Sequence, residues 1–332
     1  MLNNKTILIT GGTGSFGKVF TEKVLKEFNP KKIVIYSRDE YKQYLMKDYF
    51  KKYDDKLRFF IGDVRDRNRL YRAFDGIDIV IHAAALKQVP AAEYNPIEAV
   101  KTNIHGAENV IDAAIDKGVE KVVALSTDKA VNPINLYGAT KLVSDKLLIA
   151  GNAYVGNKNT SFSVVRYGNV SGSRGSVIPY FQSLIDSGKK TLPITDLEMS
   201  RFWVTLKEAV ELVFTALNNS SGGELYVYKC PSFKVTDLAR AMDPNCELEE
   251  IGIRPGEKLH EVMITEDDSR TTYEYDDYYI IYPSLDWWDN LNVINGGKRV
   301  KKGFKYASNN NGQWLSVEDL KKLLNATEIN FG

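Results

Sequence analysis

The segment from Ile7 to Lys18 reads ILITGGTGSFGK, and it decides how the N-terminal half of the chain folds. A short apolar run, typical of a buried strand, leads into a cluster of glycines, and a segment with helical spacing of apolar residues follows. Gly12, Gly14 and Gly17 match the G-x-G-x-x-G spacing of turns that bind dinucleotides. Small residues there let the turn close and let backbone N–H groups approach a pyrophosphate at the start of the helix. The segment therefore predicts a strand, a tight turn and a helix that bind a dinucleotide.

Outward from this turn, the first half of the chain alternates short β-branched runs with longer segments of helical spacing. We expect strands at Thr6–Thr10, Lys32–Ser37, Leu57–Ile61, Ile77–Ala83, Lys121–Ser126 and Ser161–Val165. We expect helices at Phe16–Phe28, Arg67–Phe74, Ile97–Lys117 and Leu136–Asn152, and a later one at Leu206–Leu217. This alternation predicts an α/β fold, a Rossmann-type doubly wound parallel sheet with right-handed crossovers.

The alternation stops near residue 169, where Gly, Ser and Pro become frequent and shorter elements follow. We therefore divide the chain into a cofactor-binding Rossmann domain, residues 1–168, and a smaller, mainly substrate-binding region of mixed α/β structure, residues 169–332. The boundary is approximate, because chains of this kind often return to their first domain. The tail from Tyr273 is rich in Tyr, Asp and Asn, and we expect it to form a surface extension or part of a substrate lid.

The composition excludes several classes of protein. The 332 residues include 43% apolar and 26% charged residues, as in ordinary globular proteins, and the net charge of +1 creates no global field that recruits nucleic acid or an anionic membrane. Cys230 and Cys246 are too few for a disulfide framework, and no cysteine or histidine spacing suggests a metal site. No run of about 20 apolar residues is present, and the N-terminal apolar run is too short for a signal peptide. We expect a cytoplasmic protein that binds neither nucleic acid nor membrane.

The second predicted strand ends in Ser37, Arg38 and Asp39, and this end selects the cofactor. An acidic residue there binds the ribose hydroxyls of NAD, whereas cationic residues suit the 2′-phosphate of NADP. Arg38 and the nearby Lys42 supply positive charge, so the sequence favours NADP, while Asp39 leaves NAD open. After the third strand, the Asp63 carboxylate can accept a hydrogen bond from the adenine amino group. Further cofactor contacts are expected from Gly11, Thr13, Gly14, Ser15, Phe16, Gly17, Val64 and Ala83.

The fifth predicted strand leads to Thr127, and Tyr137 and Lys141 follow on the next predicted helix. Because Tyr137 and Lys141 are four residues apart, they share one face of that helix. A tyrosine with a pKa of about 10 is a poor base at neutral pH, but a nearby lysine and a positive nicotinamide favour its phenolate. The phenolate can then take a hydroxyl proton while hydride moves to the cofactor, with Thr127 bonded to the reacting oxygen and Lys141 to the ribose. His82, on an apolar strand, is expected to be a core residue rather than a catalyst.

The chain resembles the extended short-chain dehydrogenases/reductases that modify nucleotide sugars, and the resemblance covers nearly all of it. Gly11, Gly14 and Gly17 have the wider glycine spacing of that superfamily. Four segments, STDKAVNPINLYGATK, HAAALKQVPAAEYNP, VRYGNVSGSRGSVIP and IRPGEKLHE, are similar to the inverting UDP-N-acetylglucosamine 4,6-dehydratases. The resemblance implies that UDP-N-acetylglucosamine is the substrate and that the reaction is the first step of pseudaminic acid biosynthesis.

The resemblance also implies roles for the two residues after Thr127. A 4-epimerase needs only the threonine, tyrosine and lysine, but a 4,6-dehydratase must also remove the C5 proton and expel the C6 hydroxyl group. In the inverting family the lysine at the position of Lys129 is taken to act at C5, and Asp128 would help to protonate the departing hydroxyl group. A lysine base must be neutral, so we expect burial and neighbouring cations to lower the pKa of Lys129. The implied product is UDP-2-acetamido-2,6-dideoxy-β-L-arabino-hexos-4-ulose.

Further binding positions follow from the resemblance. Lys87 would lie near the sugar and the cofactor, and Asn169 would contact the nucleotide sugar. Arg201 and Arg254 would bind the diphosphate, because a planar guanidinium matches phosphate oxygens in pairs. Glu257 would bind a ribose hydroxyl group or pair with Arg254. The remaining expected contacts are, for the substrate, Lys87, Arg174, Gly175, Ser176, Val177, Asn310 and Asn311 and, for the cofactor, Lys87, Thr102, Tyr137, Lys141 and Val170.

Three other interpretations stay open. A UDP-hexose 4-epimerase, or a C5-epimerising relative, would have the same core, although the Asp128-Lys129 pair argues against simple 4-epimerisation. A retaining dehydratase is an option, but many of those carry an N-terminal membrane region that this sequence lacks. An inactive NADP-binding sensor would keep the glycine turn, but this chain also keeps Thr127, Tyr137 and Lys141. A homo-oligomer of undetermined size is expected, as is common in the family.

Overall fold

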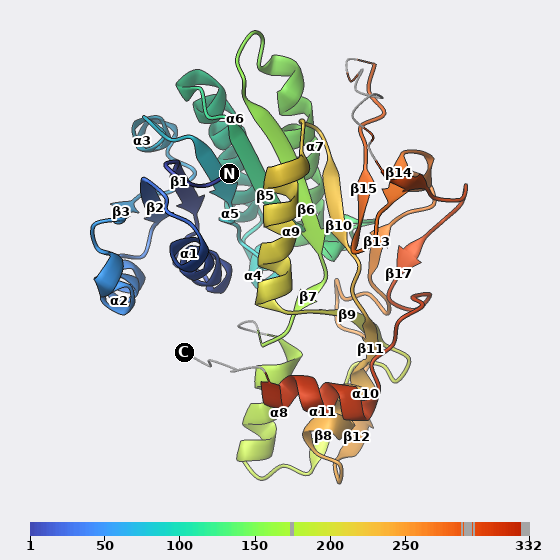
Figure 1. Cartoon of the computed structure of the whole chain (residues 1–332). Helices are drawn as coiled ribbons and strands as arrows, with labels where there is room; N and C mark the ends of the chain where they lie inside the picture. The colour runs from blue at the N-terminus through green and yellow to red at the C-terminus, as the bar shows by residue number, and fades with distance from the viewer. Residues whose placement is uncertain (173–175, 287, 289–293, 295, 327–332) are drawn as a thin grey trace.

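The computed structural model describes residues 1–172, 176–286, 288, 294 and 296–326 of the chain. Within these residues the large sheet has the strand order β16-β14-β15-β10-β6-β5-β4-β1-β2-β3 (Figure 1). The neighbouring strands β3, β2, β1, β4, β5, β6 and β10 run parallel. β15 pairs antiparallel with β10. Their bounds are β1 Thr6–Thr10, β2 Lys32–Ser37, β3 Leu57–Ile61, β4 Ile79–His82, β5 Lys121–Thr127, β6 Ser161–Tyr167, β10 Leu225–Tyr228, β14 Thr272–Glu274, β15 Tyr278–Ile281 and β16 Lys298–Arg299.

The central strands are apolar along their whole length because helices cover both faces of the sheet. All five residues of β1 are buried, and Ile9 lies in register between Ile35 of β2 and Ile81 of β4. The predicted bounds of β1, β2 and β3 agree with the structure, and the predicted doubly wound α/β fold is confirmed. The strand order reverses between β1 and β4, and ligands of such folds bind outside the carboxyl ends of the strands at this switch point.

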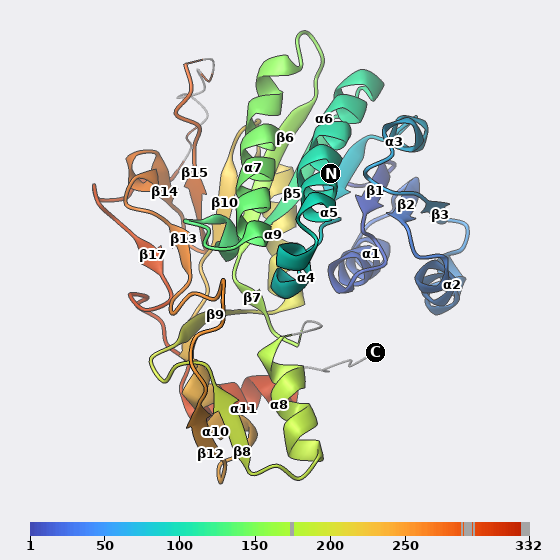
Figure 2. The same cartoon turned by 180° about the vertical axis from the view of Figure 1, so that it is seen from behind.

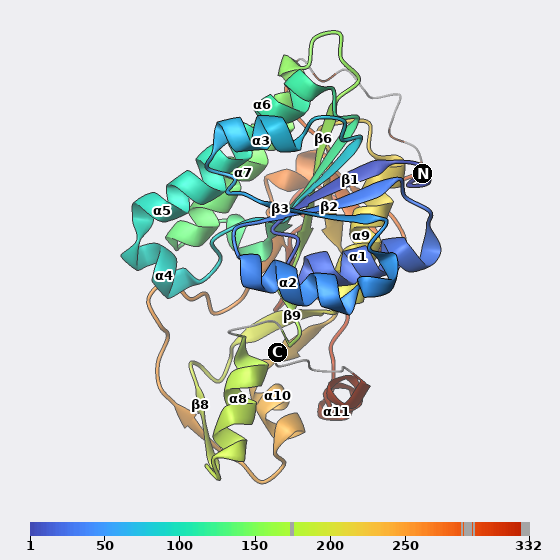
Figure 3. The same ribbon diagram turned by 90° about the vertical axis from the view of Figure 1, so that its left-hand side faces the viewer.

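Two layers of helices enclose the sheet, as the edge-on view shows (Figure 3). One face carries α1 (Ser15–Glu27), α2 (Glu40–Tyr49) and α9 (Leu206–Asn219), which share an apolar core with β1 and β2. The other face carries α3 (Arg67–Ala73), α6 (Gly106–Lys117) and α7 (Leu136–Gly151), which share a second core. Short 3-10 turns cover Lys51–Tyr53, Asp128–Ala130, Asn152–Tyr154 and Asp268–Arg270.

The helix expected at Ile97–Lys117 is interrupted. It begins with α5 (Pro96–Val100), continues as a π-helical segment, Lys101–His105, and ends as α6. Thr102 and Asn103 are buried in the π-helical segment, and such segments are frequent at functional sites. Periodicity could not reveal the interruption, because one inserted residue leaves the apolar face nearly unchanged. The preceding short helix α4 (Val89–Tyr94) was not predicted.

A smaller region lies below the large sheet in Figures 1 and 2. A third apolar core holds it together through Phe181, Trp203 and Leu238, and Leu320 of the last helix packs there as well. Its sheets pair β9 with both β7 and β11, and β8 with β12, while β13 and β17 form a separate pair that packs on the core of the large sheet. The bounds are β7 Asn169–Val170, β8 Thr191–Ile194, β9 Ser200–Val204, β11 Ser232–Lys234, β12 Glu247–Glu250, β13 Val262–Ile264, β17 Tyr306–Ala307, α8 Val177–Asp186, α10 Val235–Met242 and α11 Val317–Ala326.

The chain passes between the two regions more than once. β6 ends at Tyr167 and β7 begins at Asn169, so the smaller region starts at the carboxyl edge of the parallel sheet. The chain then returns, because α9, β10 and β14–β16 belong to the large sheet and its helical layer. The division of roles between a cofactor part and a substrate part stays a prediction. In the described part of the chain, no helix has both the length and the apolar character needed to span a membrane.

Candidate active site

The three predicted redox residues meet where β5 ends and α7 begins. The Thr127 hydroxyl interacts with the Tyr137 phenol, and Tyr137 and Lys141 lie one turn apart on α7, both almost fully buried. Thr127 Oγ1 also donates to Asp128 Oδ1 (2.9 Å) and accepts from the Lys129 backbone N–H (3.3 Å). The arrangement therefore links the redox residues directly to the Asp128-Lys129 pair.

The start of α7 is fixed by its N-cap. The Asn135 side chain accepts a hydrogen bond from the Gly138 N–H (2.8 Å), which satisfies one of the free donors at the helix start. Gly138 is needed because a Cβ atom there would collide with the carbonyl oxygen of Lys129. The helix thus packs directly on the 3-10 turn that carries Lys129, and this contact sets the distance between the two halves of the site.

Burial changes the acidity of both α7 residues. It raises the pKa of Tyr137 to about 12, although the Lys129 charge and the Thr127 hydrogen bond act in the opposite direction. It lowers the pKa of Lys141, and the Asp145 carboxylate partly offsets this effect. Tyr137 is therefore a neutral phenol at neutral pH in the protein without ligands, and only a gain of positive charge nearby can favour its phenolate.

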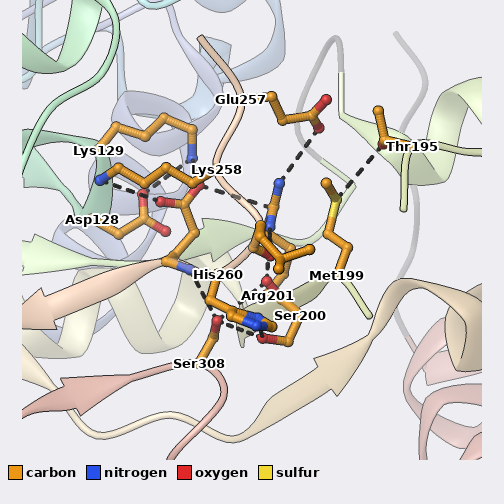
Figure 4. Close-up of polar contacts among 12 residues, drawn as sticks. Asp128, Lys129, Thr195, Met199, Ser200, Arg201, Glu257, Lys258, His260 and Ser308 are labelled. Carbon is orange, nitrogen blue, oxygen red and sulfur yellow. Dashed lines mark hydrogen bonds and ion pairs between the residues drawn. The ribbon is translucent and has the colours of Figure 1, made fainter. Parts of the chain in front are cut away.

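Lys129 lies between two buried carboxylates, one of which belongs to Asp128, labelled beside it in Figure 4. Its Nζ is 3.1 Å from Asp128 Oδ1 and 3.1 Å from Glu261 Oε1, and these two acids are only 1% and 2% exposed. Burial opposes the charge on Lys129, but Asp128 and Glu261 outweigh it and raise the pKa of the lysine. The expected lowering of this pKa is therefore wrong for the protein without ligands, because the two carboxylates outweigh burial and the Arg201 charge.

The second carboxylate belongs to a wider network of charges (Figure 4). Glu261 lies 3.9 Å from Arg201 Nε and 3.9 Å from Lys258 Nζ, in addition to Lys129. Burial alone would raise the pKa of Glu261, but these three cations lower it. Burial raises the pKa of Asp128, for which Lys129 is the main compensating charge. The two carboxylates around Lys129 thus differ in their affinity for a proton.

The glycine turn fits a dinucleotide. Gly14 is the N-cap of α1 and offers no side chain to cap the helix, so the N–H groups of the first turn are left for a ligand. Thr13 is buried, Gly11 lies in the turn, and Ser15, Phe16 and Gly17 form the first turn of α1. Their cofactor contacts stay predictions. The residues therefore fit a bound pyrophosphate.

At the end of β2 the acidic side chain is engaged within the protein, whereas a basic side chain is accessible. The Asp39 carboxylate caps α2 by accepting from the Lys42 N–H (2.9 Å), and it also pairs with Lys42 Nζ (2.9 Å). Arg38 is about half exposed and meets Asp63 at 3.5 Å. Asp63 is bonded more closely to Arg65, through its backbone N–H and its guanidinium. Ser37 is buried and accepts from Gln43 (3.0 Å), so Arg38 has the most accessible charge at this end.

The other predicted cofactor residues lie around the carboxyl edge of the sheet. Val64 is buried and follows β3, and Ala83 follows β4. The Thr102 hydroxyl is buried in the π-helical segment and has no hydrogen-bond partner in the described part of the chain. Lys87 is exposed between β4 and α4, and Val170 pairs with Val204 of β9. Their cofactor roles stay predictions.

Two predicted substrate residues carry buried polar atoms that the described residues leave unsatisfied. These atoms are Asn169 Oδ1 at the start of β7 and Ser176 Oγ before α8. Such atoms are costly to bury without a partner, and a polar ligand could supply one. Val177 begins α8, and Arg174 and Gly175 lie outside the described residues.

The remaining predicted substrate residues make contacts within the protein. Arg201 donates to the carbonyl oxygens of Ser200 (2.8 Å) and Leu259 (3.1 Å), and it pairs with Glu257 at 3.4 Å. Glu257 therefore pairs with Arg201, and not with Arg254 as the sequence suggested; Arg254 is exposed.

The asparagines expected to cover the substrate bond to their own surroundings. Asn310 accepts from the Ala307 N–H (2.8 Å), and Asn311 donates to the Cys230 carbonyl oxygen (2.7 Å). These bonds fix the turn after β17 against β11, so they give both residues a structural role. Their substrate roles stay predictions.

His82 is a core residue, as expected. Its Nδ1 lies 2.8 Å from Thr10 Oγ1, which also accepts from the N–H groups of Ala83 and Ala84. With two donors already directed at it, the Thr10 hydroxyl group gives its proton to Nδ1, so His82 carries its own proton on Nε2. Burial, with a contribution from the Lys141 charge, lowers the pKa of His82 to about 3.

Several functional candidates escaped the sequence prediction. Lys258 and Glu261 belong to the quoted segment IRPGEKLHE, but local spacing gave no sign that they reach Lys129. Asn103 bonds to both backbone groups of Leu86 (2.8 and 2.9 Å) and to Thr140 on α7 (2.9 Å). It thereby holds the segment after β4 against the catalytic helix. A buried asparagine inside an apolar helical pattern was the available signal.

Comparisons with known proteins show which proteins this chain is similar to. Residues 7–283 match the family described as polysaccharide biosynthesis protein. The UDP-N-acetylglucosamine 4,6-dehydratase (inverting) of Campylobacter jejuni is 56% identical, with 99% of each chain covered. The UDP-glucose 4-epimerase of Rickettsia conorii is 42% identical over 98% of this chain and 96% of its own length. Among solved structures, Pen from Bacillus thuringiensis has a TM-score of 0.91 at 40% identity, with 99% of each chain covered.

Proposed function

The chain belongs to the family of the inverting UDP-N-acetylglucosamine 4,6-dehydratases, and we propose that it catalyses the 4,6-dehydration of UDP-N-acetylglucosamine with inversion at C5. The proposed product is UDP-2-acetamido-2,6-dideoxy-β-L-arabino-hexos-4-ulose, and the proposed place of the reaction is the first step of pseudaminic acid biosynthesis. One observation carries the proposal: the Lys129 ammonium lies 3.1 Å from a buried Asp128, which is bonded to the catalytic Thr127.

We propose NADP as the cofactor. The uncapped start of α1 supports a bound pyrophosphate, and the accessible Arg38 beside a fully engaged Asp39 supports the 2′-phosphate. When bound, the oxidised nicotinamide accepts a hydride from C4 of the sugar and later returns it to C6. Lys141 would hold the ribose from the buried face of α7.

Tyr137 and Thr127 act at C4 in this proposal. The Tyr137 phenolate accepts the proton of the 4-hydroxyl group, and the Thr127 hydroxyl positions the same oxygen. The resting phenol has a pKa raised to about 12, so formation of its phenolate depends on positive charge from the bound ligand. The resulting 4-ketone acidifies the hydrogen on C5.

Lys129 and Asp128 act at C5 and C6. Neutral Lys129 removes the C5 proton as the C6–O bond breaks, Asp128 protonates the departing hydroxyl group, and water leaves as the C5=C6 double bond forms. After reduction at C6, a proton is added at C5 on the opposite face. A UDP-glucose 4-epimerase, the name of a 42% identical relative, is the second candidate. An epimerase has no step that uses an acid and a base at C5 and C6, so the buried Asp128-Lys129 pair favours dehydration.

Proton NMR of the purified enzyme with UDP-N-acetylglucosamine in deuterated water, without added reductant, tests the proposal. We expect a new C6 methyl signal, deuterium at C5 and the couplings of the L-arabino ketosugar. The control variant Tyr137→Phe should lose turnover while it still binds NADP. A new 4-epimer with an intact C6 hydroxymethyl group would overturn the dehydratase assignment in favour of the epimerase.

A further inference from the structure

Glu261 is a buried acid to which the sequence gave no role, and it contacts the proposed base directly. It comes from the segment before β13, far from Lys129 in the chain, yet its Oε1 lies 3.1 Å from Lys129 Nζ. Asp128 Oδ1 lies at the same distance from that nitrogen. The lysine is thus held between one carboxylate from each half of the chain (Figure 4).

The two carboxylates have unequal surroundings. Glu261 faces three cations, with Lys129 at 3.1 Å and both Arg201 and Lys258 at 3.9 Å. Asp128 faces one cation, Lys129, and the Thr127 hydroxyl group. One oxygen of each acid, Asp128 Oδ2 and Glu261 Oε2, has no hydrogen-bond partner in the described part of the chain, so the inequality lies in the neighbouring cations. The directions of the two pKa shifts agree with this inequality, raised for Asp128 and lowered for Glu261.

The proposed dehydration needs Lys129 without a proton and Asp128 with one, whereas the resting pair has the reverse arrangement. Transfer of one proton from Lys129 Nζ to Asp128 across 3.1 Å prepares both groups at once. One N–H bond breaks, one O–H bond forms, and no other reactant is required. A bound substrate that excludes water favours the transfer, because the pair then becomes neutral in a medium of low dielectric constant.

We propose that Glu261, held ionised by Arg201 and Lys258, is a positioning residue that keeps Lys129 against Asp128 and leaves Asp128 to receive the lysine proton. This inference rests on the proposed dehydration. Without the cations around Glu261, both carboxylates would compete for that proton, and a proton on Glu261 would not serve the C6 hydroxyl group.

Several contacts hold this segment in place besides the Glu261 carboxylate. Asn135 donates to the Gly256 carbonyl oxygen (2.7 Å), and Lys258 Nζ donates to the Val131 carbonyl oxygen (2.5 Å). The backbone N–H of Glu261 donates to Ser308 Oγ (3.0 Å). A glutamine at position 261 keeps all three contacts, so Glu261→Gln tests the charge itself.

The test compares Glu261→Gln with Glu224→Gln, another buried glutamate, which is 1% exposed and accepts backbone N–H groups away from the site. We expect Glu261→Gln to lower kcat by about 10²-fold, because the base is no longer held in place. The deuterium isotope effect with substrate labelled at C5 should rise, because C5 proton removal becomes slower than the redox steps. Glu224→Gln should keep the wild-type kcat and isotope effect.

The pH profile separates a positioning role from a structural one. The charged groups that face Lys129 are Asp128, Glu261, Arg201 and Lys258, and the titratable Tyr137 phenol lies beside them. Removing the anion at position 261 favours the deprotonated forms of Lys129 and Asp128, so both limbs of the kcat profile should move to lower pH. Lys258→Met removes a cation and should move them to higher pH, while Glu261→Asp should restore the wild-type profile. This set gives a result even if one variant fails to fold.

An unchanged pH profile and isotope effect in folded Glu261→Gln would overturn the inference, because a purely structural residue gives that result. Failure of the proposed function looks different: the wild-type enzyme itself would form no C6 methyl product. The wild-type NMR experiment therefore separates the two failures before any variant is compared.

Discussion

The side chain of Arg38 is 54% exposed and has one weak ion pair, at 3.5 Å from Asp63. If it binds the 2′-phosphate, Arg38→Ala should raise the Kd for NADP by about 10- to 100-fold, the value of a hydrogen bond to a charged group. The Kd for NAD should change much less. Fluorescence titration of both cofactors measures this, and Arg240→Ala, an equally exposed arginine on α10, is the matched control. Equal weakening of both cofactors would contradict the NADP assignment.

The lowered pKa of His82 predicts that the free energy of unfolding decreases at acidic pH. Its pKa is about 3 in the folded protein and 6.5 for an ordinary histidine, so below about pH 6.5 the unfolded chain binds a proton that the folded protein refuses. The stability that neutral His82 supplies is therefore present above pH 6.5 and is lost as the pH falls toward 3. The free energy of unfolding should fall by about 1.4 kcal/mol per pH unit from this group alone.

Urea unfolding at several pH values checks this slope. In His82→Gln the slope below about pH 6.5 should be smaller by that amount, whatever the variant's overall stability. His105→Gln replaces an exposed histidine and should keep the wild-type slope. The same slope in His82→Gln and wild type would rule out the buried neutral imidazole.

For individual residues, the sequence predicted the part of the site whose members lie close together in the chain. Thr127, Tyr137 and Lys141 could be placed together because a strand end and a helical spacing of four residues fix them. Glu261 could not be placed, because its approach to Lys129 depends on how the second half of the chain docks. The same gap caused the wrong expectation for the Lys129 pKa, since the sign of the shift depends on that distant carboxylate.

Among the elements, the junction of β1 and α1 has no room for a side chain at Gly17. A Cβ atom at Gly17 would collide with the carbonyl oxygen of Gly12, so the helix can approach the turn only with glycine at this position. Gly17→Ala should lower the free energy of unfolding by about 1–3 kcal/mol and weaken cofactor binding. Thermal unfolding with and without NADP measures both effects.

The matched control is Gly312→Ala. A Cβ atom at Gly312 meets nothing within 4 Å, so this substitution should leave both stability and binding unchanged. If Gly17→Ala is as stable as the wild type and binds the cofactor equally well, the predicted clash with Gly12 is wrong.

The predicted elements were accurate where one physical signal dominates. Buried parallel strands are largely apolar runs, and β1 and β2 agree with their predicted bounds. The bounds of β3, a mostly apolar strand at the edge of the sheet, agree as well. The exposed α2 was missed, because only Gln43 and Met46 of its residues are buried and it has little apolar periodicity. The short strands after β7 were missed for a related reason, because strands of two to five residues carry almost no periodic pattern.

For the molecule as a whole, α9 ties the second half of the chain to the first. Phe214 of α9 stacks between Phe20 (5.4 Å) and Phe28 (5.5 Å), both of which belong to the first helical layer. Phe214→Ala should lower the free energy of unfolding by about 3–5 kcal/mol, because it leaves a cavity between α1 and α9. Urea unfolding measures the loss, and Tyr154→Ala at an exposed ring is the control. A loss below about 1 kcal/mol would mean that the two helices repack freely.

The sheet order has a consequence for the sequence of events during synthesis. The ribosome releases the glycine turn, Thr127, Lys129 and Tyr137 with the first half of the chain, and N-terminal parts fold first. β10, which covers β6, and Glu261, which balances Lys129, are made later. A nascent chain therefore has the cofactor cradle before it has its acid–base pair in order. Under the proposed function, the residue that balances the base is therefore the last part of the acid–base site to be synthesised.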